Sequence, residues 1–171
     1  MNAIEIYKAQ ENIVKEKCAE CKTRLDAVPA EKATERKALH IELGMYNLCL
    51  RAGLFDRGGT APDHAETALA HRNAFIPKII VKYSKLAEIF ATLGKGEKEI
   101  FISAVQAELY MRDQIYKNYI CELEAAAASG DEASVFELKI KTGALESVFA
   151  AWEEWRKETG IYSGVFTEVQ I

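Results

Sequence analysis

The fold is decided by residues 97–128, which read EKEIFISAVQAELYMRDQIYKNYICELEAAAA. Polar side chains form only a thin line along this segment, at Glu99, Gln106, Asp113, Lys117 and Glu124. The remaining positions are largely apolar, and their spacing favours a helix. A helix that is apolar this far around is either central in its protein or shared with another chain.

Apolar residues recur at helical spacing on both sides of this segment. The pattern predicts further helices over about 2–27, 30–52, 60–93 and 131–159. Pro77 falls inside the helix over 60–93 and removes one of its backbone hydrogen bonds, so we expect that helix to be kinked or split near Pro77. Short turns between long helices force neighbours to run antiparallel. The predicted fold is therefore all-α, an up-and-down bundle of about five long helices.

The chain is predicted to consist of one large domain and a short C-terminal tail. Residues 1–160 are expected to form a single helical-bundle domain, and residues 161–171 an apolar C-terminal tail. The apolar residues of the tail fall at near-alternate positions, which favours a short extended segment. We expect the tail to dock on its own or a neighbouring subunit, because chain ends are ordered only when something holds them. The candidate assembly residues are Met111, Tyr116, Tyr119 and Ile120 in the central helix and Val165, Phe166, Val169 and Ile171 in the tail.

Composition excludes several functional classes. Of 171 residues, 49% are hydrophobic and 28% charged, which is typical of a globular protein in water. The net charge of −4 gives no general bias toward nucleic acid. No apolar run approaches the roughly 20 residues of a membrane span, and the N-terminus lacks the pattern of a signal peptide. We therefore expect a cytoplasmic protein without a membrane partner, whose four cysteines are free thiols.

Cys18 and Cys21 form a Cys-x-x-Cys pair, a spacing that can hold zinc or form a disulfide. Both residues fall on the apolar stripe of the first predicted helix, so we interpret them as buried core residues. The histidines do not occur in the Glu-x-x-His motif that a di-iron bundle needs, and no nucleotide-binding loop is present. The sequence predicts neither a metal site nor a cofactor.

Basic residues gather on one side of the predicted 60–93 helix, with no acidic residue from Thr67 to Ala87. Residues 1–85 carry 14 basic and 11 acidic groups, whereas residues 86–171 carry 8 and 15. We expect this basic ridge to meet acidic groups of the second half, such as Glu108, Asp113, Glu122 or Glu124, in the same or a neighbouring subunit. Binding of RNA, DNA or an acidic protein is the alternative. The ridge comprises His64, His71, Arg72, Lys78, Lys82 and Lys85.

Arg57 and His64 have the form Arg-x6-His. This spacing resembles the catalytic pair of HEPN-type ribonucleases, which are all-α bundles. The resemblance implies that Arg57 would stabilise charge developing on a phosphate and that His64 would move a proton.

Two functions follow as hypotheses. The first is a non-enzymatic helical interaction or assembly module, a homo-oligomer or a subunit of a larger complex or virus-like particle, with protein as its partner. It depends on the apolar central helix, the segregated charge and the apolar tail. The alternative is an HEPN-like ribonuclease that uses Arg57 and His64.

Overall fold

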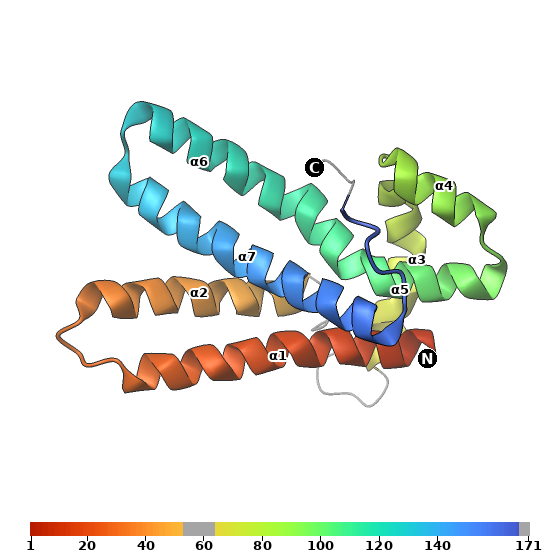
Figure 1. Ribbon diagram of the computed structural model, residues 1–171, viewed down its shortest axis with the longest axis horizontal. Helices are drawn as coiled ribbons and strands as arrows, with labels where there is room; N and C mark the ends of the chain where they lie inside the picture. The colour runs from red at the N-terminus through yellow and green to blue at the C-terminus, as the bar shows by residue number, and fades with distance from the viewer. Residues whose placement is uncertain (53–63, 168–171) are drawn as a thin grey trace.

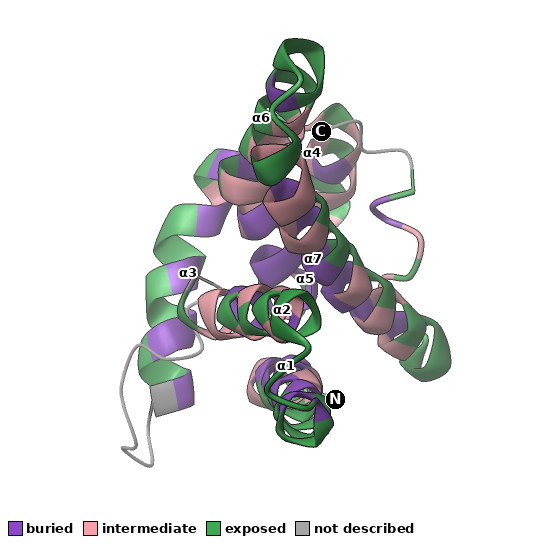
Figure 2. Ribbon diagram, turned by 90° about the vertical axis from the view of Figure 1, so that its left-hand side faces the viewer, coloured by how far each residue is buried: buried purple, intermediate pink, exposed green. Residues whose placement is uncertain are grey.

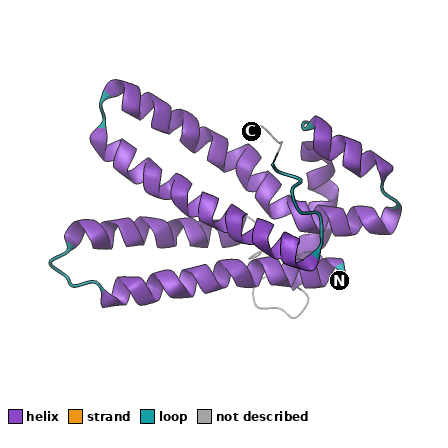
Figure 3. Ribbon diagram, viewed as in Figure 1, coloured by secondary structure: helices purple, strands orange, loops and turns teal. Residues whose placement is uncertain are grey.

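The computed structural model describes residues 1–52 and 64–167, and nearly all of them are helical. Within these residues Figure 3 shows helices and loops but no strand. No described helix is both long and apolar enough to cross a membrane. The elements in chain order are α1 (Ala3–Ala27), α2 (Ala33–Ala52), α3 (His64–Ile80), α4 (Ser84–Thr92), α5 (Lys95–Met111), the π-helical turn η1 (Arg112–Tyr116), α6 (Lys117–Ser129) and α7 (Glu132–Thr159).

Local signals at the helix ends explain several of these bounds. Asn2 and Glu5 form a capping box at the start of α1: each side chain accepts the other residue's backbone N–H, at 3.0 and 2.7 Å. Asp131 caps α7 by accepting the N–H of Ser134. Helices α6 and α7 both end at a glycine with a left-handed backbone, Gly130 and Gly160.

The helices pack as two antiparallel pairs around a central helix. In Figure 1, α1 lies beside α2 and α6 lies beside α7, while α7 also packs on α2. Helix α5 contacts α1, α2 and α3, and every residue from Phe101 to Leu109 is buried. Figure 2 shows the buried positions of the helices turned toward α5. The first half of the predicted 97–128 helix, α5, is therefore central, whereas in α6 only Ala126 is buried; the fold is all-helical as expected.

Two groups of buried side chains form the core. The first lies among α1, α2 and α7 and includes Tyr7, Cys18, Cys49 and Trp152. The second surrounds α5 and includes Phe101 and Leu109 together with residues of α3, α4 and the C-terminal segment. Cys18 and Cys21 are both buried free thiols, which confirms the interpretation of the Cys-x-x-Cys pair as part of the core.

The helix that we expected to break near Pro77 continues to Ile80. Pro77 stays inside α3, and the chain turns at residues 81–83, after which α4 begins. The backbone N–H groups of Lys82 and Tyr83 donate to carbonyls three residues back, which tightens and ends the helix. The side chains of the same two residues both bind Asp113. Pro77 removes one backbone hydrogen bond of α3, but the chain turns at 81–83, where Lys82 and Tyr83 bind Asp113.

The expected continuous helix over 97–128 also differs from the structure. It is divided into α5 and α6 by the π-helical turn η1. Its thin polar line does not face solvent throughout, because Gln106 and Asp113 are almost completely buried. Spacing alone assigned these polar residues to the surface, but both lie inside the fold.

The described part of the C-terminal segment forms turns and not the expected extended structure. Gly164 has a left-handed backbone, and Thr167 donates to the Gly164 carbonyl through both its N–H and its hydroxyl. Tyr162 packs edge-on against Phe101 of the same chain, with ring centroids 4.9 Å apart. Residues 161–167 therefore fold back onto their own chain.

Thiol reactivity follows from the burial of three of the four cysteines. Burial raises the pKa of Cys18 and Cys21, and raises that of Cys49 to about 12, whereas Cys121 is exposed on α6. We expect DTNB to modify one thiol per native chain rapidly and the other three only as the protein unfolds. The variant Cys121→Ser should lose the rapid phase. A rapid phase that survives in this variant would contradict the buried placement of the other cysteines.

Candidate functional site

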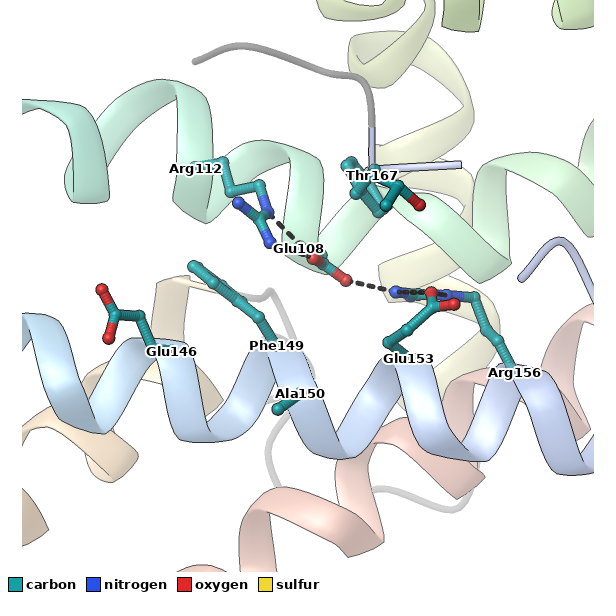
Figure 4. Close-up of a pocket in the computed structure, with 9 residues that line it drawn as sticks. Glu108, Arg112, Glu146, Phe149, Ala150, Glu153, Arg156 and Thr167 are labelled. Carbon is teal, nitrogen blue, oxygen red and sulfur yellow. Dashed lines mark hydrogen bonds and ion pairs between the residues drawn. The ribbon is translucent and has the colours of Figure 1, made fainter. Parts of the chain in front are cut away.

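A network of charged side chains joins α5 to α7 inside the protein. Arg156 is fully buried, and its Nη2 lies 2.6 Å from Oε2 of Glu108, which is also buried. The other carboxylate oxygen of Glu108 accepts from Arg112, at 2.8 Å. Arg156 also pairs with Glu153, one turn earlier on α7, at 3.0 Å. Figure 4 shows these four side chains converging between the two helices.

The C-terminal segment covers this network. The Phe166 ring lies against both arginines, with its centroid 5.4 Å from the guanidinium carbon of Arg112 and 5.2 Å from that of Arg156. The Gly164 N–H donates to Oε1 of Glu153, at 2.7 Å. Arg112 also stacks on the Phe149 ring of α7, at 4.4 Å. The network therefore holds both the two helices and the chain end.

A pocket of about 290 Å³ opens beside the network and is lined by Glu146, Ala150 and Thr167 as well as by the charged residues. Tyr116 donates to Glu146 at its rim, at 2.6 Å. Burial and this hydrogen bond raise the pKa of Tyr116 to about 12, so the phenol stays protonated at neutral pH. Both arginines at the pocket already have carboxylate partners within the chain. The arrangement is therefore suited to holding α5, α7 and the chain end together.

A second buried charge, Asp113 of η1, fixes the corner between α3 and α4. It accepts hydrogen bonds from Tyr83, from Lys117 at 3.1 Å and from Lys82 at 3.3 Å. Burial by itself would raise the pKa of Asp113, but these donors and Gln114 outweigh it and lower the pKa to about 2. The carboxylate thus stays ionised, and it ties α6 to the corner.

Only some residues of the predicted basic ridge are exposed on one helix. His71 and Lys78 are exposed on α3, and Lys82 is exposed while paired with Asp113, one of the acidic partners considered. Lys85 belongs to a different helix, α4, and is half-buried. Arg72 is buried and stacks on Tyr7 at 4.6 Å, so it does not belong to a surface ridge. The turn at 81–83 also divides the residues of the predicted ridge between two helices, α3 and α4.

The predicted assembly residues of the central helix contact their own chain. Met111 is fully buried in the core and is unavailable to a partner. Tyr116 binds Glu146, and the Tyr119 ring lies 5.4 Å from the Lys141 ammonium. Ile120 is half-buried.

Of the predicted assembly residues in the tail, Val165 and Phe166 are buried against their own chain. Val169 and Ile171 lie outside the described residues. Arg57 and the side chain of His64, the pair that resembles a ribonuclease site, lie outside them as well.

Sequence reasoning missed the role of Arg156 and Glu108 as a buried pair. Glu108 was considered as an acidic partner of the ridge, but its arginine partners come from its own helix end and from α7. One signal was present: Arg156 lies three residues from Glu153 and four from Trp152, on the apolar side of the last predicted helix. A charged residue on that side needs a buried partner of opposite charge.

Among residues 1–52 and 64–167, no group of three or more His, Cys, Asp or Glu side chains is arranged to hold a metal ion. Comparison with known proteins gives no match: no family model matches the chain, and no curated protein or solved structure is significantly similar to it. The function must therefore be inferred from the geometry of the chain itself.

The buried ion pair predicts a strongly non-additive mutant cycle. Arg156→Met removes the fully buried one of the two arginine partners of Glu108 and leaves Arg112, so we expect it to lower the free energy of unfolding by about 3 kcal/mol. Adding Glu108→Gln removes the carboxylate that has lost this partner, so the double variant should be less destabilised than the sum of the two single variants. Urea unfolding of the four proteins measures the coupling. Simple additivity would show that the pair is not coupled in the folded protein.

Asp113 predicts a specific loss of stability in acid. Its pKa is lowered from 3.8 to about 2, so its contribution of about 2 kcal/mol is complete above pH 4 and is lost as the pH falls toward 2. Asp113→Asn should reduce stability at neutral pH and flatten this part of the pH profile. Glu88→Gln, at an exposed site on α4, is the control. Urea unfolding at successive pH values tests the prediction, and identical acid profiles for wild type and Asp113→Asn would contradict it.

Proposed function

We propose that this chain is a non-enzymatic helical assembly module that forms a homo-oligomer. The observation that carries the proposal is the exposed apolar surface at the corner between α3 and α4. Val81 is 69% exposed in the turn between the two helices, and Phe75 is 39% exposed on α3. We call this region, residues 71–85 with α4, the α3–α4 end. Both side chains belong to this region, where burial against a partner would remove apolar surface from water.

Helix α4 supports the same proposal. Leu86 is its only fully buried residue, and Ile89, Phe90 and Leu93 are half-buried around it. Of the described helices, α4 packs principally on α3. Burial of these apolar groups by a second chain would be favourable, at about 25 cal/mol per Å² of apolar surface removed from water.

The remaining parts of the proposal concern organisation and location. We propose residues 1–160 as the helical domain and 161–171 as a tail whose first residues dock on their own chain, as the burial of Val165 and Phe166 supports. A cytoplasmic location is proposed because the four cysteines are free thiols. The ribonuclease hypothesis depends on Arg57 and the side chain of His64, which lie outside the described residues, so it stays a hypothesis from the sequence.

Solution mass tests the proposal. Light scattering coupled to size-exclusion chromatography, over a wide range of protein concentration, should give a mass above the 19.1 kDa of one chain at the higher concentrations. Val81→Ser should shift the equilibrium toward the monomer because it removes exposed apolar surface from the contact. Ala19→Ser, at an exposed site on α1, should leave the mass unchanged. A wild-type protein that stays monomeric throughout would disprove self-assembly.

A further inference from the structure

The two signs of charge are segregated into separate stretches of the chain. Residues 67–87 contain no acidic residue, and residues 118–138 contain no basic one. The first stretch exposes His71, Lys78 and Lys82 at the α3–α4 end. The second forms most of α6, the α6–α7 turn and the start of α7, and its exposed acidic residues are Glu122, Glu124, Asp131 and Glu132.

These two regions lie at opposite ends of the molecule. In Figure 1 the α6–α7 turn is at one end of the longest axis, and α3 and α4 are at the other. One chain therefore cannot bring its acidic turn to its own basic end. A second copy in the same orientation can, because its acidic turn meets the basic end of the first.

The acidic end also carries a place for an apolar side chain. A shallow groove of about 450 Å³ lies at the α6–α7 turn, and it is lined by Ala127, Gly130, Glu132, Val135, Phe136 and Lys139. The Lys37 ammonium of α2 lies 5.9 Å from the centroid of the Phe136 ring, so the exposed carboxylates of this end stand beside two basic groups. The α3–α4 end offers the complementary feature. Val81 is exposed in the turn between two helices, with Lys78 and Lys82 close to it in sequence.

We propose that the α3–α4 end of one copy docks on the α6–α7 turn of the next copy, with Val81 entering the groove beside Ala127 and Phe136. Lys78 then faces the carboxylates of Glu124 and Glu132, while Lys82 stays paired with Asp113 of its own chain. This inference rests on the proposed self-assembly and specifies its contact. The two contacting surfaces are different, so the association is head-to-tail and builds rings or open chains of copies. Opposite charges across the contact set its orientation, and salt weakens it.

Two variants, each blocked at one end, test the contact. Lys78→Glu with Val81→Asp blocks the basic end and leaves the acidic turn intact. Glu124→Lys with Ala127→Arg blocks the groove and leaves the basic end intact. Glu16→Lys with Ala19→Arg is the matched control, since it places the same substitutions at the same spacing on exposed sites of α1. Circular dichroism establishes that each variant keeps its helices.

Each blocked variant alone should be monomeric in light scattering, whereas an equimolar mixture of the two should form a dimer and nothing larger, because one intact contact remains between them. The control should assemble as the wild type does. Oligomers of either blocked variant alone, beside an assembling wild type, would overturn this contact and leave self-assembly standing. A monomeric wild type would overturn both.

Nucleic acid is the competing occupant of the basic end. Fluorescently labelled single-stranded RNA, added at low salt, should bind the wild type no better than it binds the Lys78→Glu, Val81→Asp variant. Binding that this variant loses, together with no dimer in the mixture, would overturn the proposed contact and assign the basic end to RNA.

Discussion

The arrangement of the helices depends on the buried contact between Arg156 and Glu108. Both side chains are buried, and a buried pair of opposite charge is tolerable only when the two groups are held together. The contact fixes the last turn of α7 against the last turn of α5. Two further hydrogen bonds connect α5 and α7 to α1. The Gln10 side chain donates to the Ala104 carbonyl of α5, and the Trp152 indole of α7 donates to the Gln10 carbonyl. Apolar packing alone allows helices to slide by a turn, whereas these bonds specify one register.

The π-helical turn η1 connects the Arg156–Glu108 contact to the α3–α4 end, where we propose assembly. Its first two residues serve opposite sides: Arg112 reaches Glu108 and the Phe166 ring, and Asp113 reaches Lys82 and Tyr83. A π-turn adds a residue to the helical repeat and so changes the direction in which successive side chains point. Because Asp113 holds the residues on one side of Val81, and the preceding Ile80 is buried, the corner between α3 and α4 is a fixed shape that presents Val81 outward.

Sequence patterns predicted those features that depend on neighbours along the chain. The all-helical fold and the burial of Cys18 and Cys21 follow from helical spacing of apolar residues. The burial of Arg72 and Asp113 could not be predicted this way. Periodicity assigns polar residues to the surface, but Arg72 stacks on Tyr7 of α1 and Asp113 binds Tyr83 of the α3–α4 corner. Such partners lie far away in sequence, so only the assembled fold reveals them.

The small net charge of −4 conceals the property that matters for assembly. Asp113 is paired with Lys82 and Lys117, so it does not cancel the exposed charge of Lys78. Around the α6–α7 turn, residues 118–138 include acidic residues but no basic one. In the proposed contact, like ends of two copies would repel each other, whereas the basic end of one copy and the acidic turn of the next would attract each other. Such repulsion would disfavour the two-fold symmetric pairing of either end with itself. The proposed association therefore has one polarity, and burial of the exposed Val81 side chain would add attraction at short range.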